Sequence, residues 1–196
     1  MATLSAACSS GDNNASGGGG PDGAGQPSGG GEGGGAEGPI NFTISEVRVS
    51  SMAAQPGPFP EDVWAAVVQL LDAYLARAMV DPLRSGAPPG GLDAVFTPAA
   101  LERVSGADRA SVVEDLISPV SGTVTADRAN TILTLLTDRS GAPVLVNASL
   151  DILLTVRSDD GAVAVARNGE VVLIQDDSGW RIDSYDLKVA RDTKPA

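Results

Sequence analysis

The chain has 196 residues, with 25 acidic against 13 basic side chains, no histidine and a single cysteine. A net charge of −12 argues against a nucleic-acid partner and against adsorption to anionic lipid, because both require clustered Lys and Arg. The missing histidine excludes Ser-His and Cys-His nucleophile pairs, and one cysteine can form neither an internal disulfide nor a structural zinc site.

The composition divides the chain into an unstructured tail and one folded unit. Residues 1–39 are mostly Gly, Ser, Pro, Asp and Asn, and we expect them to be a disordered tether because they contain too few apolar side chains to form a core. This segment carries a charge of −4, which leaves −8 for the remainder. Residues 40–59 are predicted to form a strand and a Pro-rich hinge, and residues 60–196 an α+β unit.

The sequence LSAAC, which ends at Cys8, resembles the end of a bacterial lipoprotein signal, where small residues precede a lipid-bearing cysteine. It departs from that pattern because Ser5 holds the usual leucine position and only seven residues precede Cys8, too few for a basic and an apolar region. Either the start codon was assigned too far downstream or the sequence was shortened. The alternative is an exposed cysteine in a disordered cytosolic tail. We favour lipidation of Cys8 as the sole membrane attachment, since no apolar run reaches the ~18–20 residues of a membrane span.

The first elements expected in the folded unit are a strand over Ile40–Ser50 and a long helix. The helix begins at Pro60, which suits a first turn and is followed by two acidic residues. We expect it to end at about Val80, because Pro82 disfavours a continued helix. Apolar residues at helical spacing predict its buried face: Val63, Val67, Leu70, Leu71, Tyr74 and Ala78.

Three short helices are expected next, over Leu92–Phe96, Pro98–Val104 and Asp108–Ile117. Thr97 is the predicted N-cap of the second, where its hydroxyl can accept a backbone N–H. Strands are then predicted over Asn130–Asp138 and 144–157. In the longer strand the even-numbered residues from Val144 to Val156 are apolar and share one face.

Residues 162–176 are predicted to form further strand, interrupted at Asn168-Gly169 by a tight hairpin or a bulge. In the last strand, the apolar residues expected to be buried change from even-numbered to odd-numbered positions. Trp180 and Ile182 are even, whereas Tyr185, Leu187 and Val189 are odd. Both sets can face one core only if the register shifts, so we expect a β-bulge near Asp183-Ser184.

This order of elements, ending in SGWRIDSYDLKV, resembles the cystatin-like roll of the nuclear transport factor 2-like superfamily over about Pro60–Asp192. It is most similar to actinobacterial envelope members of the mammalian-cell-entry-associated type, whose last strand often begins Gly-Trp-Arg-Ile. The resemblance implies one long and several short helices packed on a curved antiparallel sheet, with a cone beneath the first helix. Some members are isomerases, dehydratases or cyclases, while many only bind or assemble. Catalytic members usually place Asp with His, or Tyr with Asp, in the cone, and this chain has no histidine.

Tyr74, Asp183, Tyr185 and Asp186 are the candidate pocket residues. An Asp near a Tyr in an apolar cone could act as a general base with a raised pKa. The simpler interpretation, which we favour, makes both tyrosines core aromatics and the aspartates solvated. No EF-hand spacing is present, and neither a metal nor another cofactor is expected.

These patterns favour a non-catalytic protein held by Cys8 on the outer face of the bacterial plasma membrane, whose roll binds an envelope protein or a lipid-like ligand. One alternative is a small-molecule enzyme of the same fold, of the isomerase, dehydratase or cyclase type, that uses Asp and Tyr. Another is a cytosolic homodimer that associates through the face of its sheet.

Overall fold

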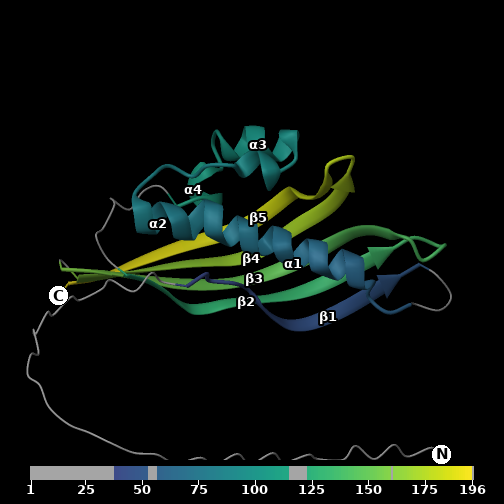
Figure 1. Ribbon diagram of the computed structural model, residues 1–196, viewed down its shortest axis with the longest axis horizontal. Helices are drawn as coiled ribbons and strands as arrows, with labels where there is room; N and C mark the ends of the chain where they lie inside the picture. Colours follow the sequence, from purple (N-terminus) through teal and green to yellow (C-terminus); the bar gives the residue numbers. More distant parts are fainter. Residues whose placement is uncertain (1–37, 53–56, 115–122, 160, 196) are drawn as a thin grey trace, which may run out of the picture. The chain divides into compact units, whose positions relative to one another are not determined.

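Five strands form a single sheet in sequence order, β1-β2-β3-β4-β5 (Figure 1). The computed structural model describes residues 38–52, 57–114, 123–159 and 161–195, so Cys8 and the predicted tether up to residue 37 lie outside the described residues. All described residues belong to one unit, Ala36–Ala196. The strands are β1 Thr43–Ser51, β2 Thr123–Thr137, β3 Pro143–Ser158, β4 Gly161–Asp176 and β5 Gly179–Pro195.

The sheet is mixed, which corrects the expectation of an entirely antiparallel one. β1 pairs with β2 in the parallel direction, whereas the other neighbours are antiparallel. The helices lie between β1 and β2 in the chain, and such a crossover returns the second strand in the same direction as the first. The α+β class predicted from the sequence is confirmed at this level.

Helix α1, Glu61–Leu75, lies across one face of the sheet (Figure 1). Its predicted apolar stripe is confirmed, because the residues of that stripe have less than a tenth of their surface exposed. They pack in one core with apolar side chains from β2 to β5, which accounts for the stability of a helix that has no side-chain N-cap. The buried residues of α1 are Val63, Val67, Leu70, Leu71, Tyr74 and Leu75.

The helical stretch does not end at Val80 as expected. A π-helical turn, η1 Ala76–Val80, leads directly into α2 Asp81–Ser85, and Gly86 closes the stretch in the left-handed conformation with φ 66°. Pro82 cannot donate to the carbonyl of Ala78, but that oxygen accepts the backbone N–H of Glu114 at 2.8 Å instead. The wider turn and this substitute donor allow the chain to pass the proline in helical form.

The combined stretch Glu61–Ser85 is long and apolar enough to cross a membrane by length and composition, although we expected no such segment. Its most apolar window has a mean hydropathy of 1.4, and half of that window is buried inside the unit. A core helix meets the same criteria, and here the buried half packs on the sheet. Length and composition therefore give only a weak indication of a membrane span.

The short helices follow the prediction in part. They are η2 Leu92–Ala94, α3 Pro98–Val104 and α4 Arg109–Val112. Thr97 caps α3 as expected, because its hydroxyl oxygen accepts the N–H of Ala100 at 3.3 Å. The last helix is shorter than predicted, since Val113 is already extended and Glu114 donates to Ala78; residues 115–117 lie outside the described residues.

The alternation in β3 is confirmed from Val146 to Val156, whereas Val144 at the start of the strand is 51% exposed. Strand β4 is continuous, and its register with β3 and β5 does not shift at Asn168-Gly169, so neither the hairpin nor the bulge forms there. Gly169 has φ 149°, and a Cβ at this position would overlap the carbonyl oxygen of Asp186 on β5. Glycine is required here by the close approach of two strands.

The predicted bulge in the last strand is confirmed. Val172 pairs with Ser184 and Leu173 pairs with Ile182, which leaves Asp183 as the extra residue of β5. The shift lets Ile182 and Leu187 both face the core despite their opposite parity.

Candidate functional site

Tyr74 lies deep in the core with none of its surface exposed. Its hydroxyl donates to the carbonyl oxygen of Val112 at 3.0 Å, and its ring packs edge-on against Phe96 with centroids 6.0 Å apart. Burial raises the pKa of Tyr74 to about 12, although the charge of Arg167 acts in the opposite direction. At neutral pH this side chain is therefore a neutral hydrogen-bond donor.

Tyr185 also packs edge-on against Phe96, with ring centroids 6.3 Å apart. Its hydroxyl donates to Asp108 Oδ2 at 3.0 Å, and the guanidinium of Arg103 lies 5.5 Å from its ring centroid. Burial and the hydrogen bond to Asp108 raise the pKa of Tyr185, while Arg103 lowers it. Neither Asp108 nor Arg103 was predicted from the sequence as a partner of this tyrosine.

The two candidate aspartates do not meet the tyrosine hydroxyls. Asp183 Oδ1 accepts from the hydroxyl of Thr97 at 3.1 Å, and its backbone carbonyl accepts from Arg103 at 2.8 Å. Asp186 is exposed and pairs with Glu170 in the β4–β5 register. Phe96 thus connects the two tyrosines, Asp183 joins the bulge to the start of α3, and Asp186 lies apart. We refer to Arg103, Asp108, Asp183 and Tyr185 as the Tyr185 cluster.

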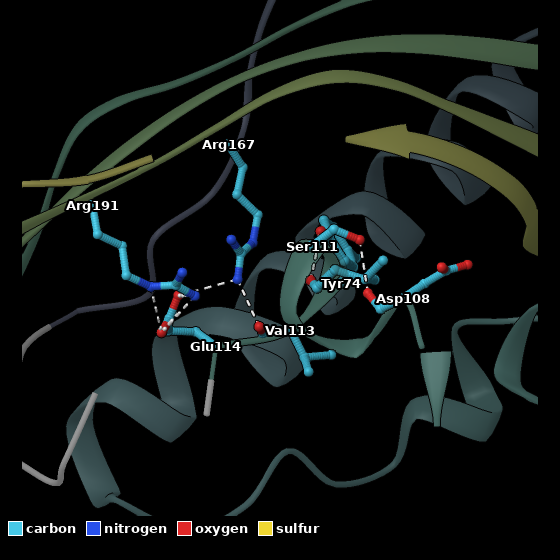
Figure 2. Close-up of polar contacts among 8 residues, drawn as sticks. Tyr74, Asp108, Ser111, Val113, Glu114, Arg167 and Arg191 are labelled. Atoms are coloured by element: carbon cyan, nitrogen blue, oxygen red, sulfur yellow. Dashed lines mark hydrogen bonds and ion pairs between the residues drawn. The ribbon is translucent and has the colours of Figure 1, made fainter. Parts of the chain in front are cut away.

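A second polar group, which the sequence analysis missed, lies inside the fold (Figure 2). The side chains of Arg167 and Glu114 have no exposed surface, and Arg167 Nη2 lies 3.1 Å from Glu114 Oε2. The same Nη2 donates to the carbonyl oxygen of Val113 at 2.6 Å. Arg191, whose side chain is 25% exposed, donates from Nη2 to the same Glu114 Oε2 at 3.0 Å and to Oε1 at 3.2 Å. We refer to Glu114, Arg167 and Arg191 as the Arg167 cluster.

The backbone positions each member of this cluster. Arg167 pairs with Val189 and Val165 with Arg191 in the β4–β5 register, so both arginines project from the same face of adjacent strands. Glu114 is fixed by its backbone hydrogen bond to Ala78 on the π-helical turn. The turn that accommodates Pro82 therefore also holds the carboxylate beneath the two guanidinium groups.

The Arg167 cluster combines two positive charges with one negative charge. The pKa of Arg167 is lowered by burial, which Tyr74 and Glu114 partly offset. Arginine nevertheless stays protonated in proteins, so neither guanidinium group can transfer a proton near neutral pH. The Nε–H and Nη1–H groups of Arg167 have no hydrogen-bond acceptor among the described residues. The guanidinium groups can bind or orient an anion, and they are not suited to general acid–base chemistry.

A weak sequence signal for this cluster was available. In β4 the odd-numbered residues from Val163 to Leu173 form an apolar row, interrupted only by Arg167 and Gly169. A charged residue on the face of a strand that is otherwise apolar and buried indicates that a buried partner neutralises it. The sequence does not indicate that this partner is Glu114, because 53 residues separate the two.

A hollow of about 270 Å³ lies at the surface between α1 and the start of β5. Small and apolar side chains, including Ala66, Ala73 and Trp180, form much of its lining, and Gln69 and Arg77 are its polar lining residues. Neither Tyr74 nor Arg167 lines this hollow.

Comparison of the chain with protein-family models, with curated proteins and with solved structures finds no match in any of the three. Within the described part of the chain, no three His, Cys, Asp or Glu side chains gather as a metal site would require.

Proposed function

We propose that the folded unit is a cystatin-like roll that binds a partner without catalysis, in a protein anchored through Cys8 to the outer face of the bacterial plasma membrane. The partner class is an envelope protein or a lipid-like ligand. One observation supports a role without catalysis: the tyrosine hydroxyls and the Asp183 carboxylate, which a catalytic Asp–Tyr site would use, are hydrogen-bonded within the fold. Tyr74 donates to Val112, Tyr185 to Asp108, and Asp183 accepts from Thr97.

The roll assignment is supported by the position of the long helix on one face of a sheet of long strands (Figure 1). It is also supported by the bulge in β5, which turns successive parts of that strand toward one core. The anchor rests on the small residues before Cys8 and the glycine-rich segment after it.

The anchor is tested by expressing the gene from its own locus and fractionating the cells. We expect wild-type protein in the membrane fraction, with mass spectrometry showing acyl chains on an amino-terminal Cys8. A Cys8→Ser variant is the matched control and should lose both properties. Wild-type protein in the cytoplasmic fraction with a free Cys8 thiol and an unprocessed amino terminus would contradict the proposal.

The binding role is tested separately with the purified protein and small carbonyl and polyketide-like substrates. We expect no turnover. Turnover that an Asp183→Asn change abolishes, while a control Asp186→Asn change leaves it intact, would establish the enzyme alternative instead.

A further inference from the structure

Arg167 has more hydrogen-bonding capacity than the surrounding protein satisfies. Its Nη2 group serves both Val113 and Glu114, while Nε and Nη1 are buried and have no acceptor among the described residues. A buried donor without an acceptor lowers stability, and more so when the donor is charged. The position of Arg167 therefore requires another acceptor.

The charges specify what kind of acceptor this is. The single carboxylate of Glu114 is shared, because Arg191 binds both of its oxygens at 3.0–3.2 Å while Arg167 binds one. The side chain of Arg191 is only 25% exposed and that of Arg167 has no exposed surface, so the cluster holds two largely buried positive charges and one negative charge. Water would satisfy the N–H groups of Arg167 but would leave the cluster with this excess of one positive charge.

We propose that Arg167 binds a monovalent anion at its Nε–H and Nη1–H groups, in the core beside the Glu114 carboxylate. One negative charge neutralises the cluster, whereas a phosphate dianion would leave an excess of negative charge among apolar side chains. A carboxylate and a halide both fit this requirement, so the anion is either a free ion or the head group of an apolar acid. This inference rests on the proposed binding role and gives it a ligand chemistry.

The test is thermal unfolding of the full chain at constant ionic strength in sodium gluconate, chloride, bromide, acetate or decanoate. Gluconate, with five hydroxyl groups, is too polar to enter the core. We expect the small anions to raise the midpoint saturably by about 3–6 °C relative to gluconate. The rise should disappear in Arg167→Met and persist in Arg157→Met, which removes an exposed arginine of β3.

The series also distinguishes the two sources of the anion. If the ligand is an apolar acid, decanoate acts at a concentration at least about tenfold below acetate, because buried methylenes add about 0.8 kcal/mol each. If it is a free ion, chloride and bromide give the full rise and decanoate has no advantage over acetate.

A crystal grown in bromide makes the test independent of whether Arg167→Met folds. An anomalous peak within hydrogen-bond distance of Arg167 Nε or Nη1 supports the proposal. Water alone at both groups, a midpoint that is equal in all salts, or an unchanged anion response in Arg167→Met would overturn it. These results leave the location of Cys8 unaffected, and an unlipidated Cys8 would leave the anion site unaffected.

Discussion

The Arg167 cluster and the Tyr185 cluster both include residues of β5 but differ in their access to solvent. In the Arg167 cluster, the side chains of Arg167 and Glu114 have no exposed surface, and Arg191 contacts both oxygens of the Glu114 carboxylate. In the second, Tyr185 is half-buried and Arg103 is exposed. Similar residue types thus form a dry ionic group at one place and a solvated one at the other. Burial, more than residue identity, decides which of them controls stability and can hold a ligand.

Replacing Glu114 should have the largest effect on this contrast. Glu114→Gln keeps the shape of the side chain but leaves two guanidinium groups without a counter-charge, one of them fully buried. We expect the free energy of unfolding in urea to fall by about 3–5 kcal/mol. Glu170→Gln, on the exposed part of β4, is the control and should change it by less than about 0.5 kcal/mol. Equal effects of the two changes on the free energy of unfolding would show that the buried ion pairs of Glu114 do not stabilise the protein more than an exposed carboxylate does.

Gly169 separates the two clusters along β4 and β5. It pairs with Leu187, between the Arg167–Val189 and Val171–Tyr185 pairs, and a Cβ there would collide with the backbone of Asp186. Gly169→Ala should lower the free energy of unfolding by about 3 kcal/mol and disturb both clusters, because the backbone must move apart. Gly106→Ala is the control, since the nearest atoms to its Cβ would lie at an ordinary 3.6 Å. Similar stabilities of the two variants would show that the backbone of β5 can move away from residue 169 without lowering the free energy of unfolding.

The difference between local and long-range contacts explains which features of the fold and of the clusters can be predicted from the sequence. Local signals were sufficient for the stripe of α1, the Thr97 cap and the bulge at Asp183, because spacing and parity depend on neighbouring residues. They were insufficient for the helix past Pro82, where the substitute donor to Ala78 comes from Glu114, 36 positions along the chain. The same residue is the ion-pair partner of Arg167 and Arg191. Pairings between distant segments depend on the finished fold, so the sequence favoured the two tyrosines and missed the buried ions.

The buried hydroxyl of Tyr74 makes the free energy of unfolding depend on pH. Burial raises its pKa from 10.0 to about 12, so the unfolded chain releases this proton first as the pH rises. The free energy of unfolding should therefore fall between pH 10 and 12, by up to about 1.4 kcal/mol per pH unit. The fall should be smaller in Tyr74→Phe than in wild type, because only the raised pKa of Tyr185 then contributes, and the part due to Tyr74 should persist in Tyr185→Phe. An identical pH profile for Tyr74→Phe and wild type would mean that the hydroxyl is not held in a dry site.

Tyr185→Phe should have the smallest effect. It removes one hydrogen bond to Asp108 at a half-buried position, where water can replace the lost partner. We expect the free energy of unfolding at neutral pH to change by less than about 1 kcal/mol. A loss as large as that of Glu114→Gln would place this cluster in the same energetic class as the Arg167 cluster.

Double-mutant cycles on both clusters test the central claim most directly. One cycle combines Glu114→Gln with Arg167→Met, and the other combines Asp108→Ala with Tyr185→Phe, each followed by equilibrium unfolding in urea. We predict a coupling of about 2–3 kcal/mol for Glu114 with Arg167 and less than about 1 kcal/mol for Asp108 with Tyr185. Equal couplings, or the larger one at Tyr185, would contradict the account.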